Sequence, residues 1–452
     1  MSALAATTPP SQASPTSTTS LTLPGPREVL DSDKASALIT TLTTTHNVNL
    51  SALTHLCLGD KSYTSSGCST MCTSLLSKCT NVTSLDLADV IAGRMEAEGL
   101  IVLSTFSTCA SNSLKNVTEI DLSDNAMGLK GISSCRPLFD TFRSTLTSIS
   151  MCNDGLSHQS MGEVADIITG KEEGKPDLPS IQLRKVHFFN NMSGVKGGEH
   201  FKRIIECQVV KNKMEDVRFS GTRAETAGSV FIVDALESRR DIFGSSLKLL
   251  DLADNTFSET NGERLANTFK AGFGQNLVEL NLRDCTLGDE NGNLLFEFLG
   301  RKLRKLDVSG NELTVESVSA LRKAVEKNVD LEILAVDEND EFESGGCVKL
   351  CKGLKGLKKL KELGMEGCGI KEKGAKALLA LELEGLEVVK LDCNMFSNEI
   401  VEKLTEKFRE KMKEFEDNIS DEEEDYETEE EEEEGEGEVD ELAAAVGKTT
   451  IE

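Results

Sequence analysis

The chain has 452 residues, of which 38% are hydrophobic, and its formal net charge at neutral pH is −28. This charge would repel nucleic acids and anionic membranes, which carry dense negative charge of their own, so neither is an expected partner. No signal peptide is recognisable at the start, and no stretch approaches the ~20 apolar residues that a membrane span needs. We therefore expect an intracellular protein, without membrane insertion, that is better suited to a basic partner protein.

The 13 cysteines are odd in number and have no paired spacing. This distribution is typical of small buried side chains in a reducing compartment rather than of a disulfide framework. Cys68 with Cys72, and Cys347 with Cys351, are spaced to share one helix face. Because no Cys-x-x-Cys pair or nearby histidine supports zinc binding, we expect these thiols to face the core, with no metal or other cofactor.

The two ends of the chain differ in composition from its middle. Residues 1–27 are rich in Ser, Thr and Pro, and we predict that they are disordered because they are too polar to pack. Residues 416–452 contain the run DEEEDYETEEEEEEGEGEVDE, which repels itself and predicts a disordered acidic tail. The VGKTT motif in this tail is no phosphate-binding loop, because Leu442 replaces its first glycine. The folded domain is therefore predicted to span residues 28–415.

Between these ends, the pattern L-x-x-L-x-L-x-x-N recurs with any apolar residue at the leucine places. Its spacing of 26 to 37 residues is that of leucine-rich repeats with loop insertions. Each unit predicts a strand, a turn and a helix, and stacking of the units buries their apolar faces. We predict an α/β solenoid of about twelve units, a ribonuclease-inhibitor-like horseshoe. The units start at Leu53, Val82, Val117, Leu146, Leu183, Met214, Leu247, Leu277, Leu303, Leu331, Leu360 and Leu386.

The last place of the pattern, here called the ladder position, is expected to hold a buried Asn that bonds backbone groups of neighbouring turns. Val90 cannot make these bonds, so we expect the turn after the second strand to take another path, with Gly93 giving the loop freedom. The place before the ladder is expected to point outward and to form a largely acidic ridge. Its members include Asp89, Asp124, Asn153, Asn190, Asp254 and Asp284.

Five of these repeats carry a more specific pattern. DVIAGRMEAE, LSDNAMG, MCNDGL, LKLLDLADNTF and LVELNLRDC occur in this order before the acidic tail. In order and spacing, the region from about Val82 to Phe415 resembles the Ran GTPase-activating proteins. The resemblance implies a cytoplasmic, monomeric activator of the small GTPase Ran that supports nucleocytoplasmic transport. It would be no enzyme on its own, and its partners would be Ran-GTP and, in a ternary complex, a Ran-binding protein.

The resemblance also implies roles for individual residues. The invariant arginine of the family's Gly-Arg loop corresponds to Arg94, and its essential asparagine corresponds to Asn153. Family members use no arginine finger: the asparagine orients the catalytic glutamine of Ran, and the arginine supports docking. We expect Arg94 to pair with an acidic group, either on Ran or, as slightly favoured, on the ridge. Glu96 stands where the family commonly has a basic residue, and the further positions expected to bind the partner are Asp89, Gly93, Asp124 and Asp154.

Two other functions fit the same sequence. A non-catalytic leucine-rich-repeat protein, such as an inhibitor, would bind its partner on the concave strands. An acidic chaperone for histones or other basic proteins would act through the tail. Because no folded domain is recognisable beside the repeats, we expect a free cytoplasmic protein, with perinuclear tethering left open.

Overall fold

The computed structural model describes residues 19–211, 213–257, 259–413, 415 and 418. Within them, fourteen parallel strands form one sheet, whose strand order follows the sequence. All twelve predicted repeats contribute one strand each, and β1 and β16 add one further strand at either end. The strands are β1 (Ser20–Thr22), β3 (His55–Cys57), β5 (Ser84–Asp86), β6 (Glu119–Asp121), β7 (Ser148–Ser150), β8 (Lys185–His187), β9 (Asp216–Arg218), β10 (Leu249–Asp251), β11 (Glu279–Asn281), β12 (Lys305–Asp307), β13 (Ile333–Ala335), β14 (Glu362–Gly364), β15 (Val388–Lys390) and β16 (Met412–Lys413).

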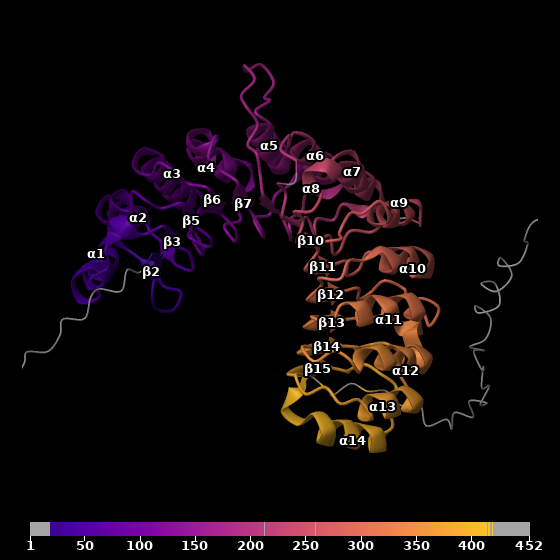
Figure 1. Ribbon diagram of the computed structural model, residues 1–452. Helices are drawn as coiled ribbons and strands as arrows, with labels where there is room; N and C mark the ends of the chain where they lie inside the picture. Colours follow the sequence, from indigo (N-terminus) through magenta and orange to yellow (C-terminus); the bar gives the residue numbers. More distant parts are fainter. Residues whose placement is uncertain (1–18, 212, 258, 414, 416–417, 419–452) are drawn as a thin grey trace, which may run out of the picture.

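A helix follows most strands and returns the chain along the outer side of the sheet (Figure 1). Parallel strands stack about 4.8 Å apart, whereas packed helices lie about 8–10 Å apart, so the stack curves toward its strands. The result is the predicted leucine-rich-repeat horseshoe. Its helices are α1 (Ser32–Thr40), α2 (Ser65–Ser74), α3 (Glu96–Ser113), α4 (Gly128–Phe142), α5 (His158–Thr169), α6 (Gly194–Glu206), α7 (Glu225–Ser238), α8 (Arg240–Phe243), α9 (Glu259–Lys270), α10 (Gly288–Phe298), α11 (Val318–Lys327), α12 (Glu343–Leu354), α13 (Glu372–Leu379) and α14 (Asn398–Phe408).

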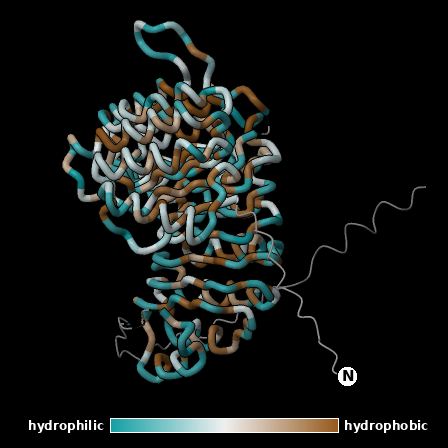
Figure 2. Tube along the Cα trace, turned by 90° about the vertical axis from the view of Figure 1, so that its left-hand side faces the viewer, coloured by the Kyte–Doolittle hydropathy of each residue, from teal (hydrophilic) through white to brown (hydrophobic). Residues whose placement is uncertain are grey.

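The core lies between the sheet and the helices. The middle residue of each three-residue strand is apolar and buried, and these residues pair in register from Leu56 and Leu85 onward. Hydrophobic and hydrophilic stretches alternate along the coils of the solenoid in Figure 2. Cys68, Cys72, Cys347 and Cys351 are buried, as the expectation of core-facing thiols requires. None of the helices in the described part of the chain is long and apolar enough to cross a bilayer.

The ladder asparagines bond the backbone of neighbouring turns, as predicted. The Asn125 amide donates to the carbonyls of Leu87 and Leu122 at 2.9 and 2.7 Å, and its oxygen accepts the Val90 N–H at 2.9 Å. Asn255, Asn311 and the other ladder asparagines donate to backbone carbonyls in the same way. Each such side chain satisfies buried carbonyls that would otherwise cost about 1–3 kcal/mol each.

Val90 does not redirect its turn, contrary to the sequence-based expectation. Asp89 has a φ of 55°, close to the 63° of Asp124 in the next repeat, and Val90 is fully buried. The Leu58 carbonyl, which an asparagine at this place would bond, accepts the Tyr63 hydroxyl at 2.8 Å instead. The departure from the regular repeat therefore begins after Val90, in the loop that leads to α3.

The folded domain begins earlier than the predicted residue 28. Ser20–Thr22 forms β1, which pairs in parallel with β3, and Leu21 and Leu23 join the core. A second, two-stranded parallel sheet joins β2 (Val29–Leu30) to β4 (Ser62–Tyr63). Residues 19–27 are therefore part of the fold. The predicted acidic tail lies, apart from residue 418, outside the described residues.

Candidate functional site

The residue before each ladder position adopts a left-handed backbone conformation. Throughout this column of residues, φ lies between 51 and 63°. Its first members are Asp60, Asp89, Asp124, Asn153 and Asn190. Asp, Asn and Gly tolerate this conformation best, because their short polar side chains bond locally or are absent. The left-handed backbone therefore explains why Asp and Asn recur in the ridge that was predicted to be acidic. Later members are Gly221, Asp254, Asp284, Gly310, Glu338, Gly367 and Cys393.

Asn153 is held between its two neighbours in this column. Its side-chain N–H donates to Asp124 Oδ1 at 2.8 Å, and its side-chain oxygen accepts from Asn190 Nδ2 at 3.0 Å. The backbone N–H of Asn153 donates to the Phe189 carbonyl at 3.0 Å. The side chain is exposed, and its amide retains a second N–H and a second acceptor lone pair. An amide that is oriented in this way can bond a further polar group without first being ordered.

Asp154, the next residue, is completely buried at the ladder position. Its Oδ1 accepts the Asn125 N–H at 2.9 Å, while Oδ2 has no hydrogen-bond partner among the described residues. Burial raises the pKa of Asp154 well above its usual range, because the ionised form loses hydration that one backbone N–H does not replace. Asp154 was expected to contact the partner, but it has no exposed surface. Its carboxylate instead accepts from the backbone of Asn125 in the preceding turn, next to Asp124.

Arg94 lies in a loop that follows β5. Gly93 has a φ of 69° there, and a Cβ at this position would meet nothing within 4 Å. Arg94 Nη1 lies 3.6 Å from Glu98 Oε2 at the start of α3, and about a fifth of the Arg94 side chain is exposed. The favoured pairing of Arg94 with the ridge is therefore not present. Asp89 pairs with Arg27 instead, and Asp124 is bonded to Asn153.

A cavity of about 310 Å³ joins the Arg94 loop to the next turn. Gly93, Arg94 and Asp124 line it, together with Glu96 and Met127. Three of the expected site residues thus share one cavity, and Asp124 links them to Asn153. Asp89 lies in the same column as Asp124, but it is nearly buried and paired with Arg27, so it offers a partner little surface. Asp154 lies beneath the surface. The part of the chain that the structure describes contains no cluster of three or more metal-ligating side chains.

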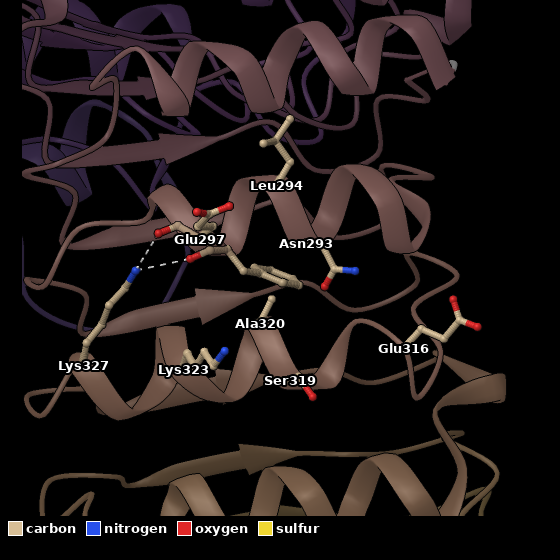
Figure 3. Close-up of a pocket in the computed structure, with 9 residues that line it drawn as sticks. Asn293, Leu294, Glu297, Glu316, Ser319, Ala320, Lys323 and Lys327 are labelled. Carbon is tan, nitrogen blue, oxygen red and sulfur yellow. Dashed lines mark hydrogen bonds between the residues drawn. The ribbon is translucent and has the colours of Figure 1, made fainter. Parts of the chain in front are cut away.

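A larger cavity, of about 690 Å³, lies between α10 and α11 on the outer side (Figure 3). Lys327 reaches across it and donates to the carbonyls of Phe296 and Glu297 at 3.3 and 3.1 Å. These carbonyls end α10, so the ammonium group caps the negative end of that helix. Burial lowers the pKa of Lys327. Since Lys327 joins α11 to the end of α10 across this cavity, we assign the cavity a structural role.

Arg27 and Glu98 are neighbours of the site that were not predicted from the sequence. Arg27 fell within the segment predicted as disordered, although the alternating leucines of SLTL are a signal for the short strand β1. Glu98 stands four residues after Arg94 at the start of a helix, which is a spacing that ion pairs commonly use.

Comparisons with known proteins agree with the fold. The family model described as "Leucine Rich repeat" matches residues 113–134, 275–290 and 301–321. The chain is 34% identical to RAN GTPase-activating protein 2 of Arabidopsis thaliana over 106 residues, which are 23% of this chain and 19% of that protein. It is 27% identical to the ribonuclease inhibitor of Mus musculus over 278 residues, 59% of this chain and 56% of that protein.

Among solved structures, the yeast Rad7 and Elc1 complex contains a similar chain. The TM-score is 0.53 at 13% sequence identity, and the match covers 84% of this chain and 86% of that one. This likeness concerns the fold. The chain spans less than two thirds of the length of either curated relative described above.

Proposed function

We propose that this leucine-rich-repeat protein accelerates GTP hydrolysis by the small GTPase Ran, by ordering the catalytic glutamine of its partner. The observation that carries the proposal is the exposed Asn153 amide, held by Asp124 and Asn190 beside the cavity of the Arg94 loop. The partial similarity to a RAN GTPase-activating protein of Arabidopsis thaliana supports the choice of Ran. The protein would act as a cytoplasmic monomer on Ran-GTP, in support of nucleocytoplasmic transport.

The Asn153 side chain suits this task chemically. Activators of this GTPase superfamily supply accelerations on the order of 10⁵-fold, or about 7 kcal/mol of barrier. Without an arginine finger, much of this must come from holding a glutamine and the attacking water in reactive geometry. A neutral amide donates one hydrogen bond and accepts another, which matches the complementary groups of a glutamine side chain. The two bonds that already fix Asn153 reduce the ordering cost of that encounter.

Arg94 is proposed to support docking. Its guanidinium is held by a single ion pair with Glu98 at 3.6 Å, so donors remain for an acidic group of the partner. Its loop and Asp124 frame the same cavity, and a partner that enters there would also meet Asn153. Gly93 gives this loop a left-handed turn with open space around it.

The test is a hydrolysis assay with Ran·GTP in excess over the full-length protein. Substoichiometric protein is expected to accelerate phosphate release catalytically, and the asparagine variant Asn153→Ala is expected to lose most of this effect. A matched control is Asp284→Ala, which alters the same column in a remote repeat. If Ran hydrolyses GTP at its intrinsic rate at every concentration of the protein, the proposal is refuted.

A second candidate is a non-catalytic binding protein that uses its concave strands. The match to mouse ribonuclease inhibitor favours it, because this match extends over 59% of the chain, more than the match to the plant protein. Binding of a ribonuclease, without acceleration of Ran hydrolysis, would support this alternative. The Ran hydrolysis assay and a ribonuclease-binding assay together therefore distinguish the two functions.

A further inference from the structure

The segment of residues 19–31, here called the N-terminal strap, is attached to the solenoid at several points. Its β1 extends the main sheet, and its β2 pairs with β4. The fully buried Lys61 donates to the carbonyl of Gly25 at 2.8 Å and to that of Pro26. The ladder position of the first repeat thus holds a lysine that fastens the strap where other repeats hold asparagine.

Arg27 of the strap forms an ion pair with Asp89. The Asp89 side chain is only 8% exposed, and its second oxygen is buried without a hydrogen-bond partner among the described residues. A carboxylate in such surroundings is strongly disfavoured unless a cation pairs with it. Arg27 keeps 57% of its own side chain exposed, so it neutralises Asp89 from the solvent side.

The strap also connects to the Arg94 loop through β4. The Ser62 N–H donates to the Glu28 carbonyl of the strap at 3.0 Å. The Ser62 hydroxyl donates to the Ala92 carbonyl at 2.6 Å, within the Arg94 loop. Tyr63 N–H donates to the Val90 carbonyl at 3.1 Å. The loop that presents Arg94 is therefore fastened to a two-stranded sheet that exists only because the strap supplies one strand.

We propose that Arg27 is a positioning residue, which occupies Asp89 so that Arg94 remains available to the partner. Asp89 and Arg94 lie at the two ends of one short loop, and both carry a buried group without a partner among the described residues: Asp89 Oδ1 and Arg94 Nε. Without Arg27, the unpaired Asp89 carboxylate would attract the Arg94 guanidinium, because the two charges are opposite and poorly hydrated. The inference rests on the proposed function of Arg94.

The experiment compares four full-length proteins: wild type, Arg27→Gln, Arg27→Lys and the double variant Arg27→Gln with Asp89→Asn. Arg27→Gln is expected to raise the apparent KM for Ran-GTP about tenfold with little change in kcat, because one charged contact of the partner is lost. Arg27→Lys should recover most of the affinity. The double variant should recover it as well, because a neutral asparagine at this place tolerates the left-handed backbone and no longer attracts Arg94.

Arg304→Gln is the matched control, because Arg304 is 58% exposed and pairs with the largely buried Glu332 in a remote repeat. It is expected to leave KM unchanged. A wild-type KM for Arg27→Gln, or a double variant as impaired as the single one, would overturn the proposal.

Hydrogen exchange in the same proteins gives a readout that does not depend on Ran. The Arg94 N–H donates to the Ile91 carbonyl at 3.0 Å, and its exchange should become faster in Arg27→Gln but not in Arg304→Gln. If wild-type protein fails to activate Ran, the proposed function fails, and the exchange rates still decide whether Arg27 orders the loop. Unchanged exchange at Arg94 would refute the role of Arg27 in positioning this loop.

Discussion

Replacing Asp154 by asparagine is expected to stabilise the protein, although the residue lies beside the proposed catalytic amide. At the ladder positions that hold asparagine, the side-chain N–H₂ group donates to one carbonyl of its own turn and one of the preceding turn, as Asn125 does to Leu122 and Leu87. In place of this N–H₂ group, Asp154 has the carboxyl oxygen Oδ2, which is buried and has no hydrogen-bond partner among the described residues. In Asp154→Asn, the new side-chain amide would face the carbonyls of Leu122 and Met151.

The magnitude follows from these contacts. An intramolecular hydrogen bond contributes about 0.5–1.5 kcal/mol net, and an unsatisfied buried polar group costs about 1–3 kcal/mol. We therefore expect Asp154→Asn to raise the free energy of unfolding by about 1–3 kcal/mol at pH 8. Because Leu122 O and Met151 O already accept from Asn125 and Asn191, the gain should not reach the sum of all these contributions.

The pH dependence has a definite sign. The pKa of Asp154 is raised in the folded protein, so the folded state holds its proton more tightly than the unfolded state. The resulting stability is fully present below the unfolded pKa and is lost as pH rises through the folded pKa. The advantage of Asp154→Asn should therefore be larger at pH 8 than at pH 5.5.

Urea unfolding of the full chain at these two pH values measures the effect. The reverse exchange Asn311→Asp, at a remote ladder position, is the matched control and should destabilise the protein more at pH 8 than at pH 5.5. A gain for Asp154→Asn that is equal at both pH values would refute the role of a buried carboxyl. A loss of stability at pH 8 would contradict the reasoning that the Asp154 carboxylate is unsatisfied at its buried oxygen.

Three further predictions concern activity. Asn153→Ala should lower kcat by about 10²- to 10³-fold in single-turnover hydrolysis while Ran-GTP binding stays near wild type, since the amide acts mainly in the transition state; equal loss of binding would contradict this. Arg94→Lys keeps the charge but loses the planar fork, so its KM for Ran-GTP should rise nearly as much as that of Arg94→Ala; a wild-type KM in both would remove Arg94 from the interface. Truncation after Phe415 should slow association with Ran more at low salt than at high salt if the acidic residues steer the encounter, and equal slowing at both would exclude steering.

The repeat architecture could be predicted from the sequence because its cause is local and periodic. An apolar residue at the strand centre and an asparagine at the ladder recur in register, so twelve strands could be placed before the structure was known. The edge strands β1 and β16 could not be placed in this way. Each pairs with one neighbour and belongs to no complete repeat, so neither carries the full pattern.

The site was less predictable, because side-chain partners depend on distances between turns. The sequence placed Arg94 near Asp89 and Asp124, yet Glu98 lies nearer on the following helix, and Arg27 arrives from a segment far away in the sequence. Asp154 shows a different limit. Its ladder position implied burial, whereas the family motif that it matches implied contact with the partner, and the structure shows burial.

The residue types in the column that contains Asn153 are not, by themselves, evidence of a binding surface. Asp and Asn recur there because the backbone is left-handed in every repeat, including repeats far from the Arg94 loop, such as those of Asp254 and Asp284. The identity of Asn153 therefore has a sufficient structural cause and cannot by itself indicate catalysis. What distinguishes Asn153 is its pair of bonds, to Asp124 on one side and Asn190 on the other, next to a cavity lined by Arg94. A functional assignment in such a repeat must rest on these partners, because the backbone alone selects the residue type.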